Sequence, residues 1–502
     1  MPAPISIVQV ASLGTIGDNV YRVHEPAAAL AKLPGVQMFE VHAQSRQRDA
    51  AALAADVLVL TMTLDVEVFR LIHQRRCLGK ATICEVNDYL PGVQPSNPAH
   101  HTWSDPRGQY LFEQLIMRSD ATQVSSAALG QKVSALTQHL AVFDNQLAAL
   151  PAPRQWPDRA PSAAPLVLGW GGSLGHLQDL QHIAPALIAW LQRHPQARLE
   201  IMADPSMAAL FESVAPEQFE FRQAGSLAHY LQWLATLDIG LAPLLPTPYN
   251  QCRSDIKFLE YAAHGVLPVL QRLEPYAKVR DGETGFLFDD PQHLLTVLDA
   301  LAGAPALRQR VADAAHAYLH SQRRIEQHAQ QRLDFYRQQM TRVQSAHTPI
   351  DIPPQLATAA AVPLLSLPNW QALGPNHHRL DLCNPAEHHS AAGVAALQSG
   401  DLAQACVEFS AAARLDPSDA TAYSFLGHCL LSQGRIALAR QALERAVALD
   451  PLLSRPVRAL ARLHSTVARH YAEHAAQLNP LPARTSPPTP WPASTAPAPV
   501  QI

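Results

Sequence analysis

The sequence predicts two doubly wound α/β domains followed by an all-α repeat module. Three observations support this prediction. Short apolar runs alternate with helical stretches from Ile5 to about Leu150, a second series of the same kind begins at Leu166, and residues near the C-terminus recur at a spacing of 34. Near-continuous apolar strands separated by helical patterns are typical of parallel sheets that are covered on both faces.

The composition indicates a protein that neither binds nucleic acid nor spans a membrane. A chain of 502 residues is too long for a single core, and 38 Lys+Arg against 42 Asp+Glu leave a formal charge of -4 rather than a basic surface. We find no apolar run of about eighteen residues and no basic segment typical of a signal peptide at the N-terminus. Six cysteines lack CxxC spacing, which fits buried thiols in a reducing compartment: Cys77, Cys84, Cys252, Cys383, Cys406 and Cys429. We therefore expect a cytoplasmic protein.

Residues 1–150 form the first predicted domain. Its strands are expected at Ile5–Val10, Val36–Val41, Val57–Thr61, Ala81–Val86, Ala121–Ser125 and Leu140–Phe143. Gly14 and Gly17 follow the first strand without dinucleotide-fingerprint spacing, and they fit either a tight turn or the close approach of a ligand. Asp88 follows the fourth strand, where open α/β sheets place ligands, although it can equally be a cap or turn residue.

Residues 151–165 carry five prolines and read as a linker to the second domain, residues 166–304. We expect its strands at Leu166–Trp170, Arg198–Ala203, Phe219–Arg222, Ile239–Ala242, Val266–Leu270 and Phe286–Phe288. Two domains of this kind enclose a cleft at the carboxyl edges of their sheets. Gly171, Gly172 and Ser173 leave the first of these strands just before a helix, which suits a loop that wraps an anion. His176 and Asp179 lie three apart on the new helix and fit either a ligand site or a surface pair.

A helix that starts at Ser254 is the most informative feature of the second domain. Ser254 is a plausible N-cap, Asp255 lies in the first turn, and Gly265 can end the helix in a left-handed conformation. A strand and a proline-rich loop precede this helix, so its N-terminus lies where a phosphate-bearing ligand would bind.

Three charged residues lie on one side of this helix. Arg253, Lys257 and Glu260 are spaced by four and three residues. Apolar neighbours argue against a merely solvated face, because unpaired charge is costly beside buried surface. We therefore favour a ligand site.

The remainder of the chain is predicted to be helical, with two interruptions. We expect crossover helices over residues 305–345, a linker over 346–385, tetratricopeptide repeats over 386–480 and a disordered, proline-rich tail over 481–502. The repeat prediction depends on six residue pairs that are 34 apart: Gly393 and Gly427, Gly400 and Gly434, Ala405 and Ala439, Ala412 and Ala446, Asp416 and Asp450, Pro417 and Pro451. A third unit, from about residue 452 to 478, is degenerate, as a capping repeat would be.

Several stretches together resemble a known enzyme family. They are YRV at 21–23, EVND at 85–88, GWGGS at 169–173 with His176 and Asp179, DIGLAPL at 238–244, RSDIKFLEY at 253–261 after Asn250, GVLPV at 265–269 and DGETGFL at 281–287. This pattern resembles retaining GT-B glycosyltransferases of glycosyltransferase family 4 over about residues 5 to 340. The resemblance implies that two Rossmann-like domains hold a nucleotide-sugar donor, that residues 1–150 bind the acceptor, and that neither a metal nor another cofactor is needed.

The resemblance also assigns roles to individual residues. Glu260 matches the second glutamate of the family's E-x7-E motif and should bind the donor ribose, whereas Cys252 stands where the first glutamate is expected. Arg253 and Lys257 are then the cations left to hold the diphosphate and stabilise it as it leaves, and Asp88 could position the acceptor hydroxyl. The remaining donor-binding candidates are Gly14, Gly17, Gly171, Gly172, Ser173, His176, Asn250, Ser254 and Asp255.

The expected function is transfer of a hexosyl-type sugar, with retention, to a protein or to a lipid-linked saccharide in glycan biosynthesis. The tetratricopeptide groove should bind a protein partner or acceptor, and peripheral membrane contact is compatible with this function. An alternative is a glycosyltransferase-like pseudoenzyme that acts as a scaffold, which the replacement at Cys252 favours. A dinucleotide oxidoreductase ranks last, because the glycine fingerprint is missing.

Overall fold

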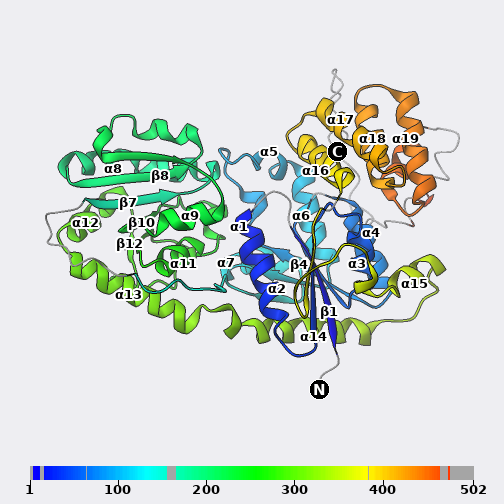
Figure 1. Cartoon of the computed structure of the whole chain (residues 1–502), viewed down its shortest axis with the longest axis horizontal. Coiled ribbons are helices and arrows are strands. Elements are labelled where there is room, and N and C mark those ends of the chain that lie inside the picture. The colour runs from blue at the N-terminus through cyan, green and yellow to red at the C-terminus, as the bar shows by residue number, and fades with distance from the viewer. Residues whose placement is uncertain are drawn as a thin grey trace. The chain divides into compact units, whose positions relative to one another are not determined.

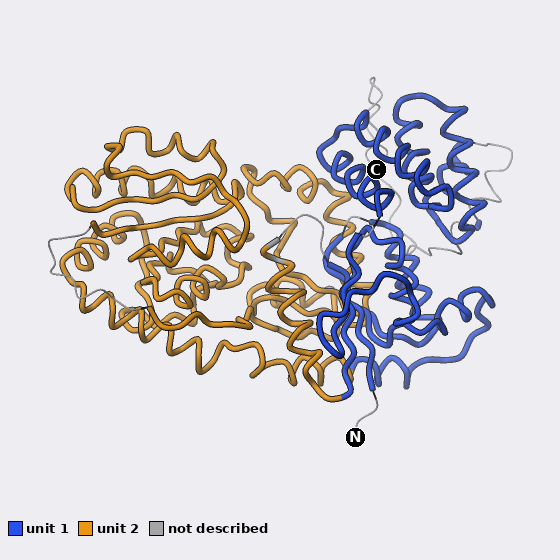
Figure 2. The backbone as a smooth tube through the Cα atoms, in the orientation of Figure 1, with its two compact units in different colours: residues 1–13, 35–82, 339–502 blue, residues 14–34, 83–338 orange. Residues whose placement is uncertain are grey.

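The computed structural model describes residues 4–11, 16–63, 65–154, 165–382, 384–463, 473–474 and 477. The chain divides into two compact units, drawn in blue and orange in Figure 2. Residues 1–13, 35–82 and 339–502 form the first unit, and residues 14–34 and 83–338 form the second. Gly14, Cys383, most of the predicted linker at 151–165, the end of the third predicted repeat and the tail at 481–502 lie outside the described residues.

The first unit contains an α/β part and a helical part. In the α/β part the strands follow the order β13-β14-β2-β1-β3, and β1 is parallel to both β2 and β3. The predicted bounds of its first three strands are confirmed, because β1, β2 and β3 are nearly continuous apolar runs. The elements of this part are β1 Ile5–Val10, β2 Val36–Val41, α3 Arg48–Ala54, β3 Val57–Thr61, α4 Glu67–Cys77, α15 Pro354–Ala360, η9 Leu364–Ser366, β13 Gln371–Gly374 and β14 His377–Leu380.

Residues 346–385, which we expected to be a linker, contain regular secondary structure. They contain α15 and the hairpin of β13 and β14, and β14 runs parallel to β2. The carboxylate of Glu40 on β2 is buried and pairs with His377 Nε2 at 2.5 Å and with Arg379 Nη2 at 3.0 Å. Strand β14 is therefore held by charged groups. It lacks the alternating apolar pattern from which a strand is predicted, so nothing in the sequence indicated it.

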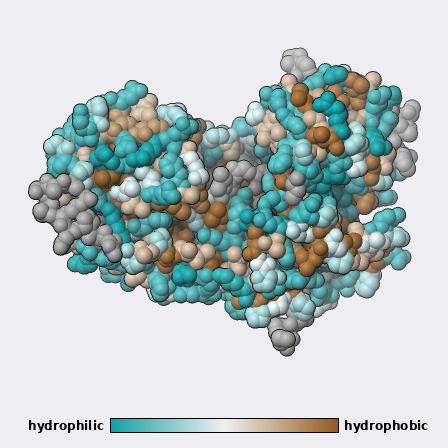
Figure 3. All heavy atoms as spheres, viewed as in Figure 1, coloured by the Kyte–Doolittle hydropathy of each residue, from teal (hydrophilic) through white to brown (hydrophobic). Residues whose placement is uncertain are grey.

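The helical part of the first unit confirms the tetratricopeptide prediction. Gly393 and Gly427 lie where a Cβ atom would come within 2.8 Å of Phe409 and 2.6 Å of Leu443, so glycine lets each helix pair approach closely. Figure 1 shows these helices in yellow to orange, and the face in Figure 3 has hydrophobic residues among hydrophilic ones over them. They are α16 Pro385–Gln398, α17 Leu402–Leu415, α18 Ala420–Ser432, α19 Ile436–Leu449 and α20 Ser454–Leu463.

Polar contacts, of which those between Ser454 and Glu67 are buried, fix the repeat helices to the α/β part of the same unit. The Glu67 carboxylate accepts hydrogen bonds from Ser454 N at 3.3 Å, Ser454 Oγ at 3.1 Å and Arg455 N at 2.7 Å. Glu67 thereby caps the N-terminus of α20 from another element. Arg455 Nη2 also lies 3.1 Å from Asp65 Oδ1, and Arg46 pairs with Asp416. The repeats are therefore attached at the ends of β2 and β3, where Arg46, Asp65 and Glu67 follow these strands.

The second unit includes a short parallel set of strands, β4-β5-β6, together with the helices around it. Residues 20–24 form a π-helix, a rare conformation that often occurs at functional sites. The elements are α1 Ile16–Asn19, η1 Val20–His24, α2 Glu25–Leu30, β4 Ala81–Val86, η2 Leu90–Gly92, α5 His100–Trp103, α6 Pro106–Arg118, β5 Ala121–Val124, α7 Ala127–Val133, η3 Ser134–Leu136 and β6 Leu140–Val142.

The larger sheet of the second unit has six parallel strands in the described residues, in the order β12-β11-β10-β7-β8-β9. Its strands lie within one residue of their predicted bounds at each end. They are β7 Leu166–Gly171, β8 Ala197–Ala203, β9 Phe219–Gln223, β10 Ile239–Ala242, β11 Leu267–Gln271 and β12 Phe286–Phe288. Its helices and short turns are η4 Leu174–His176, α8 Leu177–Arg193, η5 Pro205–Phe211, η6 Pro216–Gln218, α9 Leu227–Leu234, α10 Pro248–Gln251, α11 Ile256–Ala263, η7 Glu274–Tyr276 and α12 Pro291–Ala302.

Helices cover both faces of this sheet, as Figure 1 shows. One apolar core joins the strands to α8 and α12 through side chains such as Trp190 and Leu298, and another joins them to α9 and α11 through Trp233 and Phe258. Helix α11 lies very close to β10, because a Cβ atom at Gly240 would come within 2.4 Å of the Tyr261 ring. This packing fixes the helix that carries the predicted charged residues.

Two long helices complete the second unit, and the second of them runs into the first unit. The predicted crossover segment forms α13 Pro305–Gln322 and α14 Ala329–Ala346, separated by the short turn η8 Ile325–Gln327. Within the described part of the chain, none of the helices is long and apolar enough to cross a membrane.

Candidate functional site

The predicted site residues that the structure describes all belong to the second unit. Strand β7 ends at Gly171 and leads through η4 into α8, while β10 leads through α10 into α11. Because β7 and β10 are adjacent and parallel, both connections leave the sheet at its carboxyl edge. This edge is where open α/β sheets bind ligands.

A buried carboxylate joins these two connections. Asp179 on α8 is fully buried, and its Oδ1 accepts hydrogen bonds from Leu245 N at 2.9 Å and from Asn250 Nδ2 at 2.8 Å. Its Oδ2 lies 2.8 Å from His176 Nδ1. The predicted His–Asp pair is therefore part of the buried framework of the site. Asn250 Oδ1 is also buried, and it has no hydrogen-bond partner among the described residues.

His176 is a buried imidazole that lies within the electrostatic influence of both predicted cations. Burial lowers its pKa below the ordinary value of 6.5, and the positive charges of Arg253 and Lys257 lower the pKa further. Asp179 opposes this shift through its hydrogen bond and its charge. His176 is therefore neutral at pH 7. The two cations that act on it are Lys257, in the first turn of α11, and Arg253, three residues before the helix begins.

Lys257 and Glu260 are linked by a tyrosine hydroxyl. Lys257 Nζ donates to Tyr230 Oη at 2.6 Å, and Tyr230 Oη donates to Glu260 Oε2 at 3.0 Å. Tyr21 Oη donates to the other carboxylate oxygen of Glu260 at 3.1 Å. Burial and the nearby Glu260 raise the pKa of both tyrosines, so both hydroxyls stay protonated and act as donors. The Lys257 side chain remains 22% exposed, whereas that of Glu260 is 6% exposed.

A second tyrosine hydroxyl connects two further predicted residues. Arg253 Nη1 donates to Tyr249 Oη at 2.8 Å, and Tyr249 Oη donates to Asp88 Oδ2 at 3.1 Å. The structure therefore brings Asp88, which follows β4, to the residues around Arg253. Neither Asp88 nor Arg253 is buried, so both remain accessible to a ligand.

The first turn of α11 differs from the prediction. The helix begins at Ile256, and Ser254 does not cap it, because Ser254 Oγ accepts a hydrogen bond from Asn145 Nδ2 at 2.9 Å. Asp255 forms a buried bidentate ion pair with Arg323, at 2.6 and 2.9 Å. Its carboxylate therefore anchors α11 to the end of α13, and we no longer count Asp255 among the donor contacts. Gly265 does end the helix region with φ of 66°, as predicted.

Cys252 is buried at the end of α10. Its carbonyl accepts a hydrogen bond from Ser126 Oγ at 2.8 Å. Burial raises the pKa of the Cys252 thiol to about 11, so the side chain is neutral. A neutral thiol therefore occupies the position at which the family resemblance implies a carboxylate.

The glycines of the β7 connection are explained by packing. A Cβ atom at Gly171 would come within 2.6 Å of Tyr230, and one at Gly172 within 2.7 Å of Trp170. Neither glycine has a positive φ. Gly172 and Ser173 also border a pocket of about 290 Å³ at the ends of β7, β8 and β9, so the predicted loop does adjoin open space. Gly17 lies in α1 and is exposed.

Sequence reasoning missed the three tyrosines whose hydroxyls join the site. Tyr21 appeared only within a motif, Tyr249 only within the proline-rich loop, and Tyr230 not at all. Tyr230 and Trp233 lie on α9 in a pattern that resembles any amphipathic helix. No local signal in the sequence distinguishes a tyrosine that binds Glu260 from one that only packs. Among the described residues, no cluster of three or more His, Cys, Asp or Glu side chains could hold a metal ion.

Comparison with known proteins gives matches to one family model and to several solved structures. A tetratricopeptide-repeat model matches residues 390–454, and no curated protein matches the sequence. Sucrose-phosphate synthase from Thermosynechococcus elongatus is similar at 13% identity with a TM-score of 0.51, over 67% of this chain and 100% of that chain. HepE from Anabaena, solved with UDP and glucose, is similar at 12% identity with a TM-score of 0.49, over 66% and 100%. TarM is similar at 7% identity with a TM-score of 0.44, over 56% of this chain and 54% of TarM.

The likeness to sucrose-phosphate synthase concerns the arrangement of the α/β sheets and their helices. The fold is GT-B. The GT-B part is followed by a tetratricopeptide module, which the family model and the helix pairs of the first unit both identify. At 13% identity the likeness extends to the fold alone, so the activity has to be argued from the site.

Proposed function

We propose that this chain is a glycosyltransferase that takes a sugar from a nucleotide-sugar donor. The observation that carries the proposal is the placement of two partly exposed cations, Arg253 and Lys257, beside the carboxyl edge of the larger sheet. The diphosphate is the part of such a donor that needs these cations. The GT-B fold supports the same conclusion.

The contacts of α11 suggest how the donor would bind. Lys257 and Arg253 would hold the diphosphate, and Glu260 would accept hydrogen bonds from the ribose hydroxyls. Each charge-assisted hydrogen bond of this kind contributes about 1.5–3 kcal/mol. Tyr230 and Tyr21 already occupy both oxygens of Glu260, so ribose would exchange with these hydroxyls.

The same cations would assist the chemical step. Negative charge develops on the diphosphate as the bond to the sugar breaks, and cations fixed beside it stabilise that charge. We propose that the reaction follows the retaining course of glycosyltransferase family 4 and needs no bound metal. Asp88 would position the acceptor hydroxyl, since Tyr249 connects it with Arg253.

We propose a protein or a lipid-linked saccharide as the acceptor, with the reaction in the cytoplasm. The repeats support a protein partner, because helix pairs of this kind commonly present a groove to proteins. Their polar contacts to Glu67 and Asp65 would hold such a partner close to the α/β part of the first unit.

A panel of UDP-, GDP-, ADP- and dTDP-sugars tests the proposal by thermal shift and by donor hydrolysis. A true donor at about 1000 times its Kd would stabilise the protein by roughly 4 kcal/mol. The proposal fails if no nucleotide sugar raises the melting temperature and none is hydrolysed.

The second candidate is a pseudoenzyme scaffold that acts through its repeats. The neutral, buried Cys252 favours this alternative, because it cannot provide the carboxylate of the family motif. The two candidates differ in one measurement. A scaffold binds its protein partner but shows no saturable nucleotide-sugar binding in calorimetry.

A further inference from the structure

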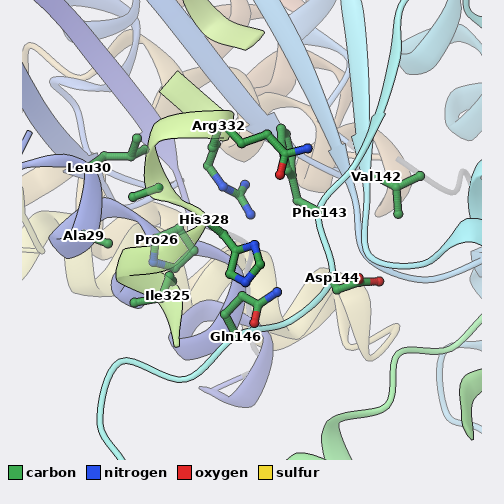
Figure 4. Close-up of a pocket in the computed structure, with 12 residues that line it drawn as sticks. Pro26, Ala29, Leu30, Val142, Phe143, Asp144, Gln146, Ile325, His328 and Arg332 are labelled. Atoms are coloured by element: carbon green, nitrogen blue, oxygen red, sulfur yellow. The ribbon is translucent and has the colours of Figure 1, made fainter. Parts of the chain in front are cut away.

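The second unit contains a pocket away from the predicted donor residues. It measures about 230 Å³ and lies where α2, the segment after β6 and the start of α14 meet (Figure 4). Pro26, Ala29, Leu30 and Ile325 form an apolar wall. None of the predicted donor residues lines this pocket.

Arg332 gives the pocket a buried cation. It is 7% exposed, and its guanidinium lies 4.4 Å from the centre of the Phe143 ring. Its Nη1 atom is buried and has no hydrogen-bond partner among the described residues. Figure 4 shows the guanidinium reaching into the pocket beside Phe143, toward His328. A buried guanidinium without a hydrogen-bonded anion is costly, so the arrangement calls for one.

The nearest carboxylate is already shared. Glu85 Oε1 accepts from Arg22 Nε at 2.9 Å and from Arg22 Nη2 at 2.7 Å, while Glu85 Oε2 accepts from Gln123 Nε2. Arg332 Nη1 lies 3.9 Å from Glu85 Oε2, which is too far for a hydrogen bond. Two guanidinium groups thus lie beside one carboxylate, and the second of them, Arg332, also lines the pocket.

Two other acidic groups near the pocket do not satisfy Arg332. Asp144 lines the pocket but pairs with Lys278. Glu25 precedes Pro26 and accepts a hydrogen bond from Ala148 N at 3.0 Å, and burial raises its pKa to about 7. Asp144 and Glu25 thus each have a partner other than Arg332.

We propose that this pocket is a second ligand site, which binds a small molecule through a carboxylate or phosphate group. The oxyanion accepts hydrogen bonds from Arg332, and the rest of the molecule packs against the apolar wall formed by Pro26, Ala29, Leu30 and Ile325. This site is independent of the proposed donor site, and it exists whether or not the chain transfers sugars. A volume of about 230 Å³ suits a small metabolite rather than a nucleotide sugar.

The test measures the melting temperature of the full chain against inorganic phosphate and against propionate, with chloride added to keep the ionic strength equal. We expect saturable stabilisation by at least one of the two anions, and the stronger one identifies the group that the site prefers. Arg332→Gln should weaken the apparent affinity at least tenfold. Arg310→Gln is the matched control, because Arg310 is exposed on α13 and does not line the pocket, and it should bind as wild type does.

Two further variants keep the result interpretable. Gln331→Trp changes an exposed lining residue, leaves Arg332 intact and should also weaken binding by steric filling. Lys257→Ala should leave the part of the anion effect that depends on Arg332 unchanged, even where phosphate also binds at the proposed donor site. If Lys257→Ala abolishes the effect, the anion binds at the donor residues and the proposal is wrong. It is equally overturned if Arg332→Gln binds as wild type does, or if neither anion gives saturable stabilisation.

Discussion

Replacing Lys257 with alanine tests the proposed donor site most directly. The Lys257 side chain is 22% exposed, and its Nζ lies 3.3 Å from Glu260 Oε2. Its charge also acts on His176, so it reaches the place where the diphosphate would bind. Loss of one charge-assisted hydrogen bond should cost about 1.5–3 kcal/mol, which weakens UDP or GDP binding roughly 13- to 160-fold. Isothermal titration calorimetry measures this change.

The control variant has to separate an effect on nucleotide binding from an effect on the stability of the protein. Removing Lys257 also leaves the Glu260 carboxylate with only the two tyrosine hydroxyls, and we expect a fall in the free energy of unfolding of about 1–2 kcal/mol, because the pair is partly exposed. Lys32→Ala is the matched control, since Lys32 pairs with Glu326 on the surface with 68% of its side chain exposed. If Lys257→Ala binds the nucleotide as tightly as Lys32→Ala does, the diphosphate assignment is wrong.

Three further predictions concern the framework. Glu67→Gln should weaken the cap on α20 by about 1 kcal/mol, seen as faster amide exchange from Ser454 onward with unchanged exchange in α8. Asp255→Asn should lower the free energy of unfolding by about 3–5 kcal/mol in urea titrations, because Arg323 is left buried without its anion. Burial lowers the pKa of His428 to about 4, so unfolded chains bind more protons below pH 6.5 and stability should fall by about 2 kcal/mol between pH 7 and 5. His428→Gln should remove that fall.

The parallel strands could be predicted closely because burial on both faces imposes apolar runs. The bounds of β1, β2, β3, β4, β10 and β12 agree with the sequence prediction, and the tetratricopeptide helices follow from glycine and alanine positions that close packing requires. The hairpin at 371–380 could not be predicted in this way. Its strand β14 is fixed by ion pairs to Glu40, which lies more than 330 residues earlier in the chain.

The sequence predicted correctly those contacts of the site that join two residues of the same helical segment. His176 and Asp179 do pair, and Lys257 and Glu260 do lie together, because residues three apart on a helix are neighbours. Asp255 was misread for the opposite reason. Its partner is Arg323, 68 residues away, and no local pattern distinguishes a first-turn aspartate that contacts a ligand from one that anchors a distant helix.

The tyrosine hydroxyls change how donor binding should be understood. Glu260 already accepts from Tyr21 and Tyr230, so a ribose hydroxyl that replaces one of them exchanges one hydrogen bond for another. Such an exchange yields little net free energy, because the bond that is lost and the bond that is gained are of the same kind, a hydroxyl donating to the Glu260 carboxylate. The diphosphate carries negative charge, so it competes for Lys257 more strongly than the neutral Tyr230 hydroxyl does, while Glu260 is a charged competitor. Donor affinity should therefore depend on Lys257 and Arg253 more than on Glu260, and Glu260→Gln should weaken nucleotide binding less than Lys257→Ala does.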